Sequence, residues 1–351
     1  IQQAYETLSS PEKRKIYDRS IPDNLKVPLT AAMSIRVSRS VIPAMQEPQL
    51  LYTLIDINCT GEMDSSRMPP SAICLVIDRS TSMKGERLEM VKANVAQLIK
   101  TLKPKDLISI VVFSDRADVI IPPTQVSDLD KIQGKINTLD VGGATEMYQG
   151  LEAGVALLLR SPENSLVRQL ILMTDGHTYG DEEDCFRLAK TAAEANISMA
   201  AFGFGSEWND GFLDQLVSIS GGSTVFVTSS KDLQNFLSQR LHAIGVANAS
   251  AVNLVMTVDP ALEIRYAFRL RPDLSPIPVE SPIPLGSLQY GKGISVLIEI
   301  YVKSIPVDTR ELQLGTGRVN FKLPSQTISH GRLTFNICRP VAPEVEREIP
   351  P

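Results

Sequence analysis

The sequence predicts an α/β fold, a doubly wound and mostly parallel sheet, inserted in an antiparallel β-sandwich and preceded by a short helical segment. From residue 71 to about 244, all-apolar runs alternate with amphipathic helical stretches, which is typical of a parallel sheet covered on both sides. After residue 247 helical periodicity is absent, and β-like runs are separated by Pro and Gly. The β-like runs before residue 60 are too few to form a stable sheet alone, so we expect them to join the later strands.

The α/β segment is expected to span residues 71–245. Its strands are predicted at residues 72–77, 107–113, 170–173, 198–204 and 224–227. Its helices are predicted at residues 86–102, 128–139, 147–159, 184–194, 211–219 and 231–242. In open sheets of this kind, ligands bind just beyond the carboxyl ends of the strands.

The β-sandwich is expected to combine residues 28–68 with residues 246–340. Its strands are predicted at residues 33–37, 50–57, 252–258, 262–268, 294–302, 319–323 and 331–337. The segment 50–57 (LLYTLIDI) alternates between more and less polar residues, which indicates a sheet with one wet face.

The composition limits the classes of function. The 351 residues are 43% hydrophobic and carry a net charge of −5, which argues against a nucleic-acid or membrane-surface binder. No apolar run approaches the roughly 20 residues of a membrane helix. The four cysteines lie far apart without a C-x-x-C pair, so we expect reduced thiols and a cytoplasmic protein. Because the chain opens without Met, we expect a fragment, and targeting stays open.

Oxygen-bearing side chains gather at one predicted edge of the parallel sheet. They come from residues 78–82 (DRSTS), 142–145 (GGAT) and 174–176 (TDG), which follow strands or precede a helix. Together they supply two carboxylates and three hydroxyls, with no imidazole or thiolate: Asp78, Asp175, Ser80, Ser82 and Thr145. Hard oxygen ligands of this kind suit Mg²⁺ or Mn²⁺, with Ca²⁺ as a further candidate.

Each of these segments also fits an ordinary structural role. Ser80 and Thr145 each precede a predicted helix, so either hydroxyl could serve as an N-cap. Capping does not explain the joint order of apolar strand, D-x-S-x-S, Gly-Gly-x-Thr, apolar strand and T-D-G. We therefore interpret the set as a metal site.

On these motifs, residues 71–245 resemble a von Willebrand factor type A domain, whose metal-ion-dependent adhesion site is written D-x-S-x-S, T and D. The resemblance implies a Rossmann-like fold in which Ser80, Ser82 and Thr145 bind the cation directly. It implies that Asp78 and Asp175 bind directly or through water. Residues 75–92 (LVIDRSTSMKGERLEMVK) are similar to bacterial members. The layout of the flanking β segments is similar to that of inter-alpha-trypsin-inhibitor heavy chains and integrin β chains.

The resemblance implies cation-dependent protein recognition. A cation with few charged ligands keeps an open position, which an Asp or Glu of a partner protein can fill. We therefore expect a binding module and not an enzyme. Two alternatives stay open: an adaptor of an AAA+ ATPase of the MoxR or magnesium-chelatase type, and a metal-dependent phosphoester hydrolase. In several family members, movement of the last helix, here residues 231–242, accompanies a shift in coordination.

Residues 1–20 carry a second resemblance. The segment 4–20 (AYETLSSPEKRKIYDRS) resembles the end of a J-domain, a module that stimulates a DnaK-type chaperone through a His-Pro-Asp loop. No HPD occurs in this sequence, so any chaperone recruitment is expected to need residues upstream. An ordinary pair of capped helices is the alternative.

Three further residues are candidates for partner contact: His177, Gly143 and Trp208. For His177 the alternative is a surface-loop histidine without a metal role, and for Trp208 it is a loop anchor. The segment 286–293 (GSLQYGKG) nearly matches a P-loop, but a strand and not a helix follows it, so we predict a β-turn.

Overall fold

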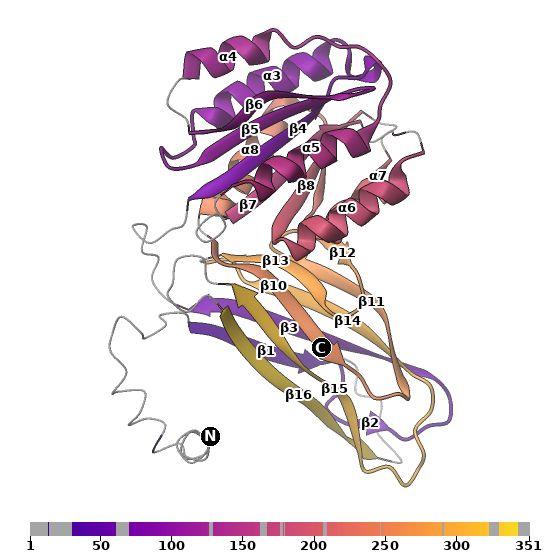
Figure 1. Ribbon diagram of the computed structural model, residues 1–351. Coiled ribbons are helices and arrows are strands. Elements are labelled where there is room, and N and C mark those ends of the chain that lie inside the picture. Colours follow the sequence, from indigo (N-terminus) through magenta and orange to yellow (C-terminus); the bar gives the residue numbers. More distant parts are fainter. Residues whose placement is uncertain are drawn as a thin grey trace.

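The computed structural model describes residues 13, 30–60, 70–125, 129–161, 167–175, 178, 180–205, 209–245, 247–289, 291–322 and 330–342. The described residues form two regions, which we call the α/β region (residues 70–245) and the β region (residues 30–60 and 247–342) (Figure 1). The segment that resembles a J-domain lies outside the described residues apart from Lys13.

The α/β region is built on a six-stranded sheet in the order β6-β5-β4-β7-β8-β9. Its strands are β4 (Ser71–Asp78), β5 (Leu107–Phe113), β6 (Ala117–Gln125), β7 (Val167–Thr174), β8 (Ile197–Phe204) and β9 (Thr224–Val227). All neighbours pair in parallel except β5 and β6. Every residue of β4 and β7 is buried, as expected for central strands covered on both faces.

Helices cover both faces of this sheet (Figure 1). The helical elements are the short 3₁₀ helix η2 (Thr81–Met83), α3 (Glu86–Ile99), α4 (Leu129–Asn137), α5 (Met147–Leu159), α6 (Glu182–Glu194), α7 (Asp210–Ser218) and α8 (Ser230–Gly245). Helices α3, α4 and α8 pack on one face, and α5, α6 and α7 pack on the other. On α3, Leu88, Val91 and Val95 form the buried stripe at helical spacing.

The β region consists of two five-stranded sheets in the orders β1-β3-β14-β11-β12 and β13-β10-β15-β16-β2. Its strands before the α/β region are β1 (Thr30–Val37), β2 (Ile42–Pro43) and β3 (Gln49–Thr60). Those after it are β10 (Ala247–Thr257), β11 (Leu262–Arg271), β12 (Ser275–Ile277), β13 (Ile283–Gln289), β14 (Ile294–Val302), β15 (Glu311–Lys322) and β16 (His330–Ala342). The two sheets share one hydrophobic core, to which Ile55 and Leu254 belong.

Strands from both sides of the α/β region lie in one sheet. Strand β3 pairs antiparallel with β14, with Leu54 opposite Leu297. Inward residues of this pair, such as Ile55 and Ile298, are fully buried, while Tyr52 on the outer face is exposed. The predicted mostly parallel α/β sheet with additional antiparallel sheets is therefore confirmed.

The two regions meet at Arg269 of β11, whose side chain is almost completely buried. Its guanidinium donates to the main-chain carbonyls of Gly221, Gly222 (2.7 Å) and Leu285 (3.2 Å). The first two carbonyls belong to the turn between α7 and β9, and the third belongs to β13. One buried cation thus ties the α/β region to the β region through three main-chain carbonyl groups.

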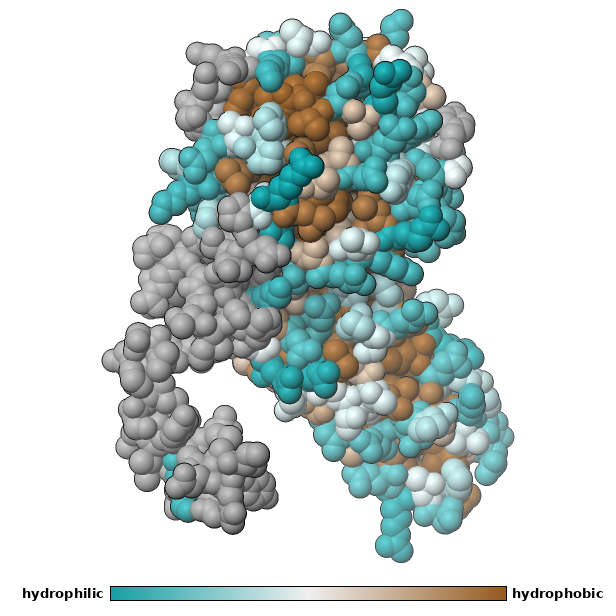
Figure 2. Space-filling model, in the orientation of Figure 1, coloured by the Kyte–Doolittle hydropathy of each residue, from teal (hydrophilic) through white to brown (hydrophobic). Residues whose placement is uncertain are grey.

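On the face seen in Figure 2, hydrophobic side chains gather in separate patches over both regions, among hydrophilic ones. The exposed apolar residues of the β region include Tyr266, Phe268 and Leu270 on β11. None of the described helices has the length and apolar character needed to cross a bilayer.

Candidate metal site

The two acidic residues of the predicted metal site lie on adjacent strands. Asp78 is the last residue of β4, and Asp175 directly follows β7. The strands pair in parallel with Ile77 opposite Met173, so their carboxyl ends reach the same edge of the sheet. Thr174 Oγ1 donates to Asp78 Oδ2 at 2.7 Å, and this bond links the two strand ends.

The loop after β4 brings two hydroxyls beside Asp78. The Ser80 main-chain N–H donates to Asp78 Oδ1 at 2.8 Å, so this carboxylate fixes the loop. The Ser80 and Ser82 hydroxyl oxygens lie 2.9 Å apart. Ser80 stands at the N-cap position of η2, but its side chain makes no capping hydrogen bond. N-capping therefore does not explain why a hydroxyl side chain stands at position 80.

Thr145 approaches the same edge from the loop before α5. Gly142 N donates to Arg79 O at 2.9 Å, and Thr81 N donates to Gly143 O at 3.4 Å, so this loop is fastened to the loop after β4. Thr145 is buried, with 4% of its surface exposed. The N-cap position of α5 is Glu146, so Thr145 does not cap that helix.

Gly143 has a steric role in this arrangement. Its φ of +84° is in the left-handed region, and a Cβ there would lie 2.5 Å from Asp115 Oδ1 and 3.0 Å from Ser114 Oγ. A larger residue would therefore push the loop that carries Thr145 away from β5. The residue is itself exposed, as a partner contact requires.

Two buried carboxylates with few donors characterise the site. Asp78 is fully buried and Asp175 is 3% exposed. Burial raises the pKa of Asp78 to about 6, and the negative charge of Asp175 adds to the rise, while hydrogen bonds from Ser80 and Thr174 oppose it. Asp175 Oδ1 is buried and has no hydrogen-bond partner among the described residues. A buried carboxylate oxygen without a donor is costly unless a cation meets it.

This donor set fits a hard divalent cation. The candidate ligands are oxygens only, and among the described residues no group of three or more His, Cys, Asp or Glu side chains could form another type of metal centre. Hydroxyl and carboxylate oxygens are ligands that Mg²⁺ and Mn²⁺ accept, usually together with water. A bound cation would meet the unpartnered Asp175 oxygen and the paired serine hydroxyls.

Arg87 is a feature of the site that the sequence motifs did not indicate. Its Nη1 lies 3.6 Å from Asp175 Oδ2 and donates to Ser82 O at 3.1 Å. Gly205, with a φ of +89°, leaves the room for it, since a Cβ there would lie 2.5 Å from Arg87 Nη2. Arg87 stands in the first turn of α3, where the helix dipole disfavours a cation. The unfavourable place of Arg87 in the first turn is the one clue in the sequence that this arginine has a role outside its own helix.

Two of the tentative partner contacts, His177 and Trp208, lie outside the described residues. The structure also shows polar contacts behind Thr145 that the sequence did not indicate. Thr178 Oγ1 donates to Thr145 O at 3.5 Å, and Asp181 accepts from the Tyr148 N–H at 2.7 Å. These bonds attach the segment after β7 to the start of α5.

Comparison with known proteins supports the fold of the α/β region. Residues 72–239 match the family described as von Willebrand factor type A domain. The α/β region has the fold of a von Willebrand factor type A domain. Two solved structures support the fold of nearly the whole chain. The protein "von Willebrand factor type A from Catenulispora acidiphila" aligns over 92% of this chain and 76% of its own, with a TM-score of 0.71 and 16% identity. The ArnB paralog VWA2 from Sulfolobus acidocaldarius aligns over 90% and 76%, with a TM-score of 0.60 and 16% identity.

Curated relatives share sequence with the type A domain and beyond it. An uncharacterized protein of Synechocystis is 28% identical over 254 residues, which are 69% of this chain and 60% of that protein. The uncharacterized protein YfbK of Escherichia coli is 23% identical over 292 residues, 81% of this chain and 50% of that protein. Mouse inter alpha-trypsin inhibitor, heavy chain 4, is 25% identical over 210 residues, 56% of this chain and 22% of that protein. The chain thus spans only part of these relatives' lengths.

Proposed function

We propose that this protein is a non-enzymatic, divalent-cation-dependent protein-binding module. Asp78, Ser80, Ser82, Thr145 and Asp175 would hold Mg²⁺, with Mn²⁺ or Ca²⁺ as possible substitutes. The ion would supply Lewis acidity to a carboxylate from a partner's Asp or Glu.

One observation carries this proposal. Within the part of the chain that the structure describes, the buried Asp175 Oδ1 lacks a hydrogen-bond partner, and the nearby Ser80 and Ser82 hydroxyls lie 2.9 Å apart. A structural cap or turn would have used these oxygens in hydrogen bonds to main-chain N–H groups. An unpaired carboxylate oxygen beside two hydroxyls that bond each other, at the edge of a parallel sheet, is instead suited to a ligand.

The charge of the site favours an acidic partner. Two carboxylates and the guanidinium of Arg87 lie at the cation position, so the loaded site would carry a net positive charge. A positive, partly enclosed site attracts a carboxylate more strongly than a neutral amide. We therefore propose that the partner presents Asp or Glu.

We further propose that the module acts as an adaptor. The J-domain resemblance of residues 1–20 favours delivery of a bound protein to a DnaK-type chaperone, and an AAA+ ATPase is the alternative recipient. Affinity capture from the native host, with and without Mg²⁺, distinguishes the two recipients. Mg²⁺-dependent recovery of a DnaK-type chaperone supports the first, and recovery of an AAA+ ATPase supports the second.

Metal binding tests the proposal directly. Titration calorimetry with MgCl₂ and MnCl₂ is expected to show one site in the wild type. The substitution Thr145→Ala should weaken Kd by about 100-fold or more, because it removes a ligand oxygen. The unfolding midpoint in EDTA should change little, since Thr145 caps no helix.

A matched control is Thr138→Ala, which removes an exposed threonine whose hydroxyl donates to Lys135 O. This variant should bind the cation as the wild type does. Absence of Mg²⁺ and Mn²⁺ binding by the folded wild type would refute the proposed function.

A further inference from the structure

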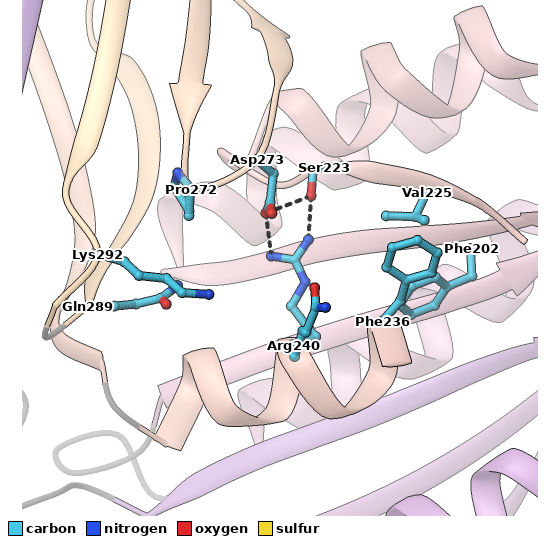
Figure 3. Close-up of a pocket in the computed structure, with 10 residues that line it drawn as sticks. Phe202, Ser223, Val225, Phe236, Arg240, Pro272, Asp273, Gln289 and Lys292 are labelled. Carbon is cyan, nitrogen blue, oxygen red and sulfur yellow. Dashed lines mark hydrogen bonds and ion pairs between the residues drawn. The ribbon is translucent and has the colours of Figure 1, made fainter. Parts of the chain in front are cut away.

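A small cavity lies at the junction of the two regions, far along the chain from the metal-site residues. It has a volume of about 40 Å³ and is lined from the α/β region by Arg240 of α8, Ser223 and a group of apolar side chains. From the β region it is lined by Asp273, Gln289 and Lys292. Figure 3 shows Lys292 and Gln289 facing Arg240 from one side and Phe202, Phe236 and Val225 on the other.

Positive charge is in excess around this cavity. Arg240 Nη1 lies 3.6 Å from Asp273 Oδ2, and this carboxylate also accepts from Ser223 Oγ at 3.2 Å. Arg269, immediately behind, donates to main-chain carbonyls and has no carboxylate partner among the residues that the structure describes. Lys292 adds a third cation at the cavity wall. The cavity wall therefore carries one aspartate and two basic side chains, Arg240 and Lys292, and the charge of Arg269 lies close to that of Arg240.

Arg240 and Arg269 are both largely buried, so solvent screens their excess positive charge only in part. The Arg269 residue is 2% exposed, and the Arg240 side chain is 16% exposed. Burial lowers the pKa of Arg269 to about 10, and the like charge of Arg240 lowers it further, while Asp273 opposes both. Both arginines stay charged at neutral pH, so the cavity has a positive potential that solvent screens only in part.

Gln289 supplies a second, independent observation. It is 4% exposed, and its Oε1 is buried without a hydrogen-bond partner in the part of the chain that the structure describes. A buried carboxamide normally pairs its polar atoms, because leaving one unpaired costs about 1–3 kcal/mol. The amide can rotate by half a turn, which would present its N–H groups to the cavity instead. Gln289 can thus donate to an acceptor placed there.

The size of the cavity limits what it can hold. One water molecule needs roughly 10–15 Å³ on the same measure, so the space corresponds to about three waters. A nucleotide or a peptide does not fit, whereas a tetrahedral oxyanion replaces a water cluster of this size. Its oxygens would face donors of three kinds: a guanidinium, an ammonium and an amide.

We propose that this junction is a binding site for a small free oxyanion, phosphate or sulfate, held by Arg240, Lys292 and Gln289. The bound anion bridges α8 of the type A domain and the turn between β13 and β14, and so stabilises the docking of the two regions. This site is independent of the proposed metal site. A ligand that binds only the docked form raises the unfolding midpoint by mass action.

The test uses the full chain in EDTA, so that phosphate cannot act through a bound cation. Sodium phosphate and sodium chloride are compared at equal ionic strength and neutral pH by titration calorimetry and thermal unfolding. We expect saturable phosphate binding and a higher unfolding midpoint in phosphate than in chloride. Lys292→Gln should weaken the phosphate Kd by about fivefold or more.

The matched control is Lys303→Gln, because Lys303 follows the end of β14 whereas Lys292 precedes its start. This control should bind phosphate as the wild type does. Gln289→Leu should also weaken phosphate binding, yet leave the unfolding midpoint in chloride unchanged or higher, since it removes an unpaired polar group. Equal midpoints of the wild type in phosphate and chloride would overturn the proposal, as would an unchanged phosphate Kd in Lys292→Gln.

Discussion

The two carboxylates of the metal site differ in what surrounds them. Asp78 accepts from the Ser80 N–H and the Thr174 hydroxyl, whereas Asp175 has one oxygen 3.6 Å from Arg87 and the other without a partner in the described ranges. Asp78 is therefore the structural anchor of the loop. A change in the charge of a neighbouring side chain, such as Arg87, should therefore act mainly on Asp175.

Arg87→Gln is expected to tighten cation binding. The guanidinium shares Asp175 with the ion and repels it, and a unit charge acting on a dication across several ångströms of partly solvated protein is worth roughly 1 kcal/mol. Removing the charge should lower the Kd for Mn²⁺ by about fivefold, as measured by titration calorimetry.

Arg87→Lys is the control, because it keeps the positive charge and should leave the Kd near the wild-type value. Weaker binding in Arg87→Gln would mean that Arg87 mainly orients Asp175 and that repulsion is the smaller effect.

The candidate ligands could be predicted from the sequence because each lies next to an apolar strand or at the start of a helix. Asp78 and Asp175 follow runs whose burial is evident from composition, and parallel strands end at one edge. Arg87 and Gly205 could not be predicted, since they meet only through the packing of α3 beside the end of β8. No local pattern encodes that contact.

Among the elements, buried strands were the easiest to predict. The runs at β4, β5 and β8 are largely apolar because both faces are covered. Strand β6 was not predicted: as an antiparallel edge strand with mixed burial, it lacks both a continuous apolar run and strict alternation. Strand β15 extends from residue 311, well before the predicted start at 319, because Gly315 and Gly317 interrupt the apolar pattern.

A polar cluster also joins four strands of the β region. Asp56 of β3 accepts from Ser295 of β14 and from Arg36 of β1 at 2.9 Å, and Arg271 of β11 lies 3.4 Å away. Burial raises the pKa of Asp56, but the hydrogen bonds from Ser295 and Arg36 and the charges of Arg36 and Arg271 outweigh this and lower it below its ordinary value of 3.8.

The stability of the β region should therefore depend on this carboxylate in acid. A pKa lowered by folding means that the stabilisation is present above pH 3.8 and is lost as the pH falls through the folded-state value. Asp56→Asn should lower the free energy of unfolding by about 1–2 kcal/mol at pH 7, as measured by urea titration.

The difference from wild type should shrink as the pH falls well below 3.8. Asp308→Asn, at an exposed turn, is the control and should show little change at either pH. A difference for Asp56→Asn that is the same at pH 7 and in acid would contradict the assigned role.

At the scale of the whole molecule, the buried side chain of Arg269 joins the two regions, beside the contacts of Asp273 with Arg240 and Ser223. Arg269→Gln shortens the side chain and leaves the carbonyls of Gly221, Gly222 and Leu285 without their donors. The free energy of unfolding should fall by about 3 kcal/mol or more. In calorimetry, we expect one unfolding transition for the wild type and two for Arg269→Gln, one for each region.

Arg318→Gln serves as the control, since this arginine is exposed on β15. It should leave both the midpoint and the number of transitions unchanged. One sharp transition in Arg269→Gln at the wild-type midpoint would show that the regions are held together by other contacts. The sequence did not predict Arg269 in this role, because nothing local distinguishes it from the exposed arginines of the same strand.

The pairing of β3 with β14 also bears on how the chain is made. Asp56 and Ser295 are 239 positions apart and form a direct hydrogen bond. At typical rates of synthesis, the ribosome needs roughly 10–50 s to pass from the first to the second. During that interval the type A domain can complete its own sheet, while the β1–β3 hairpin has an open strand edge and no core to cover it. Whatever shields that edge in the cell therefore helps to decide how many nascent chains reach the native state and how many aggregate.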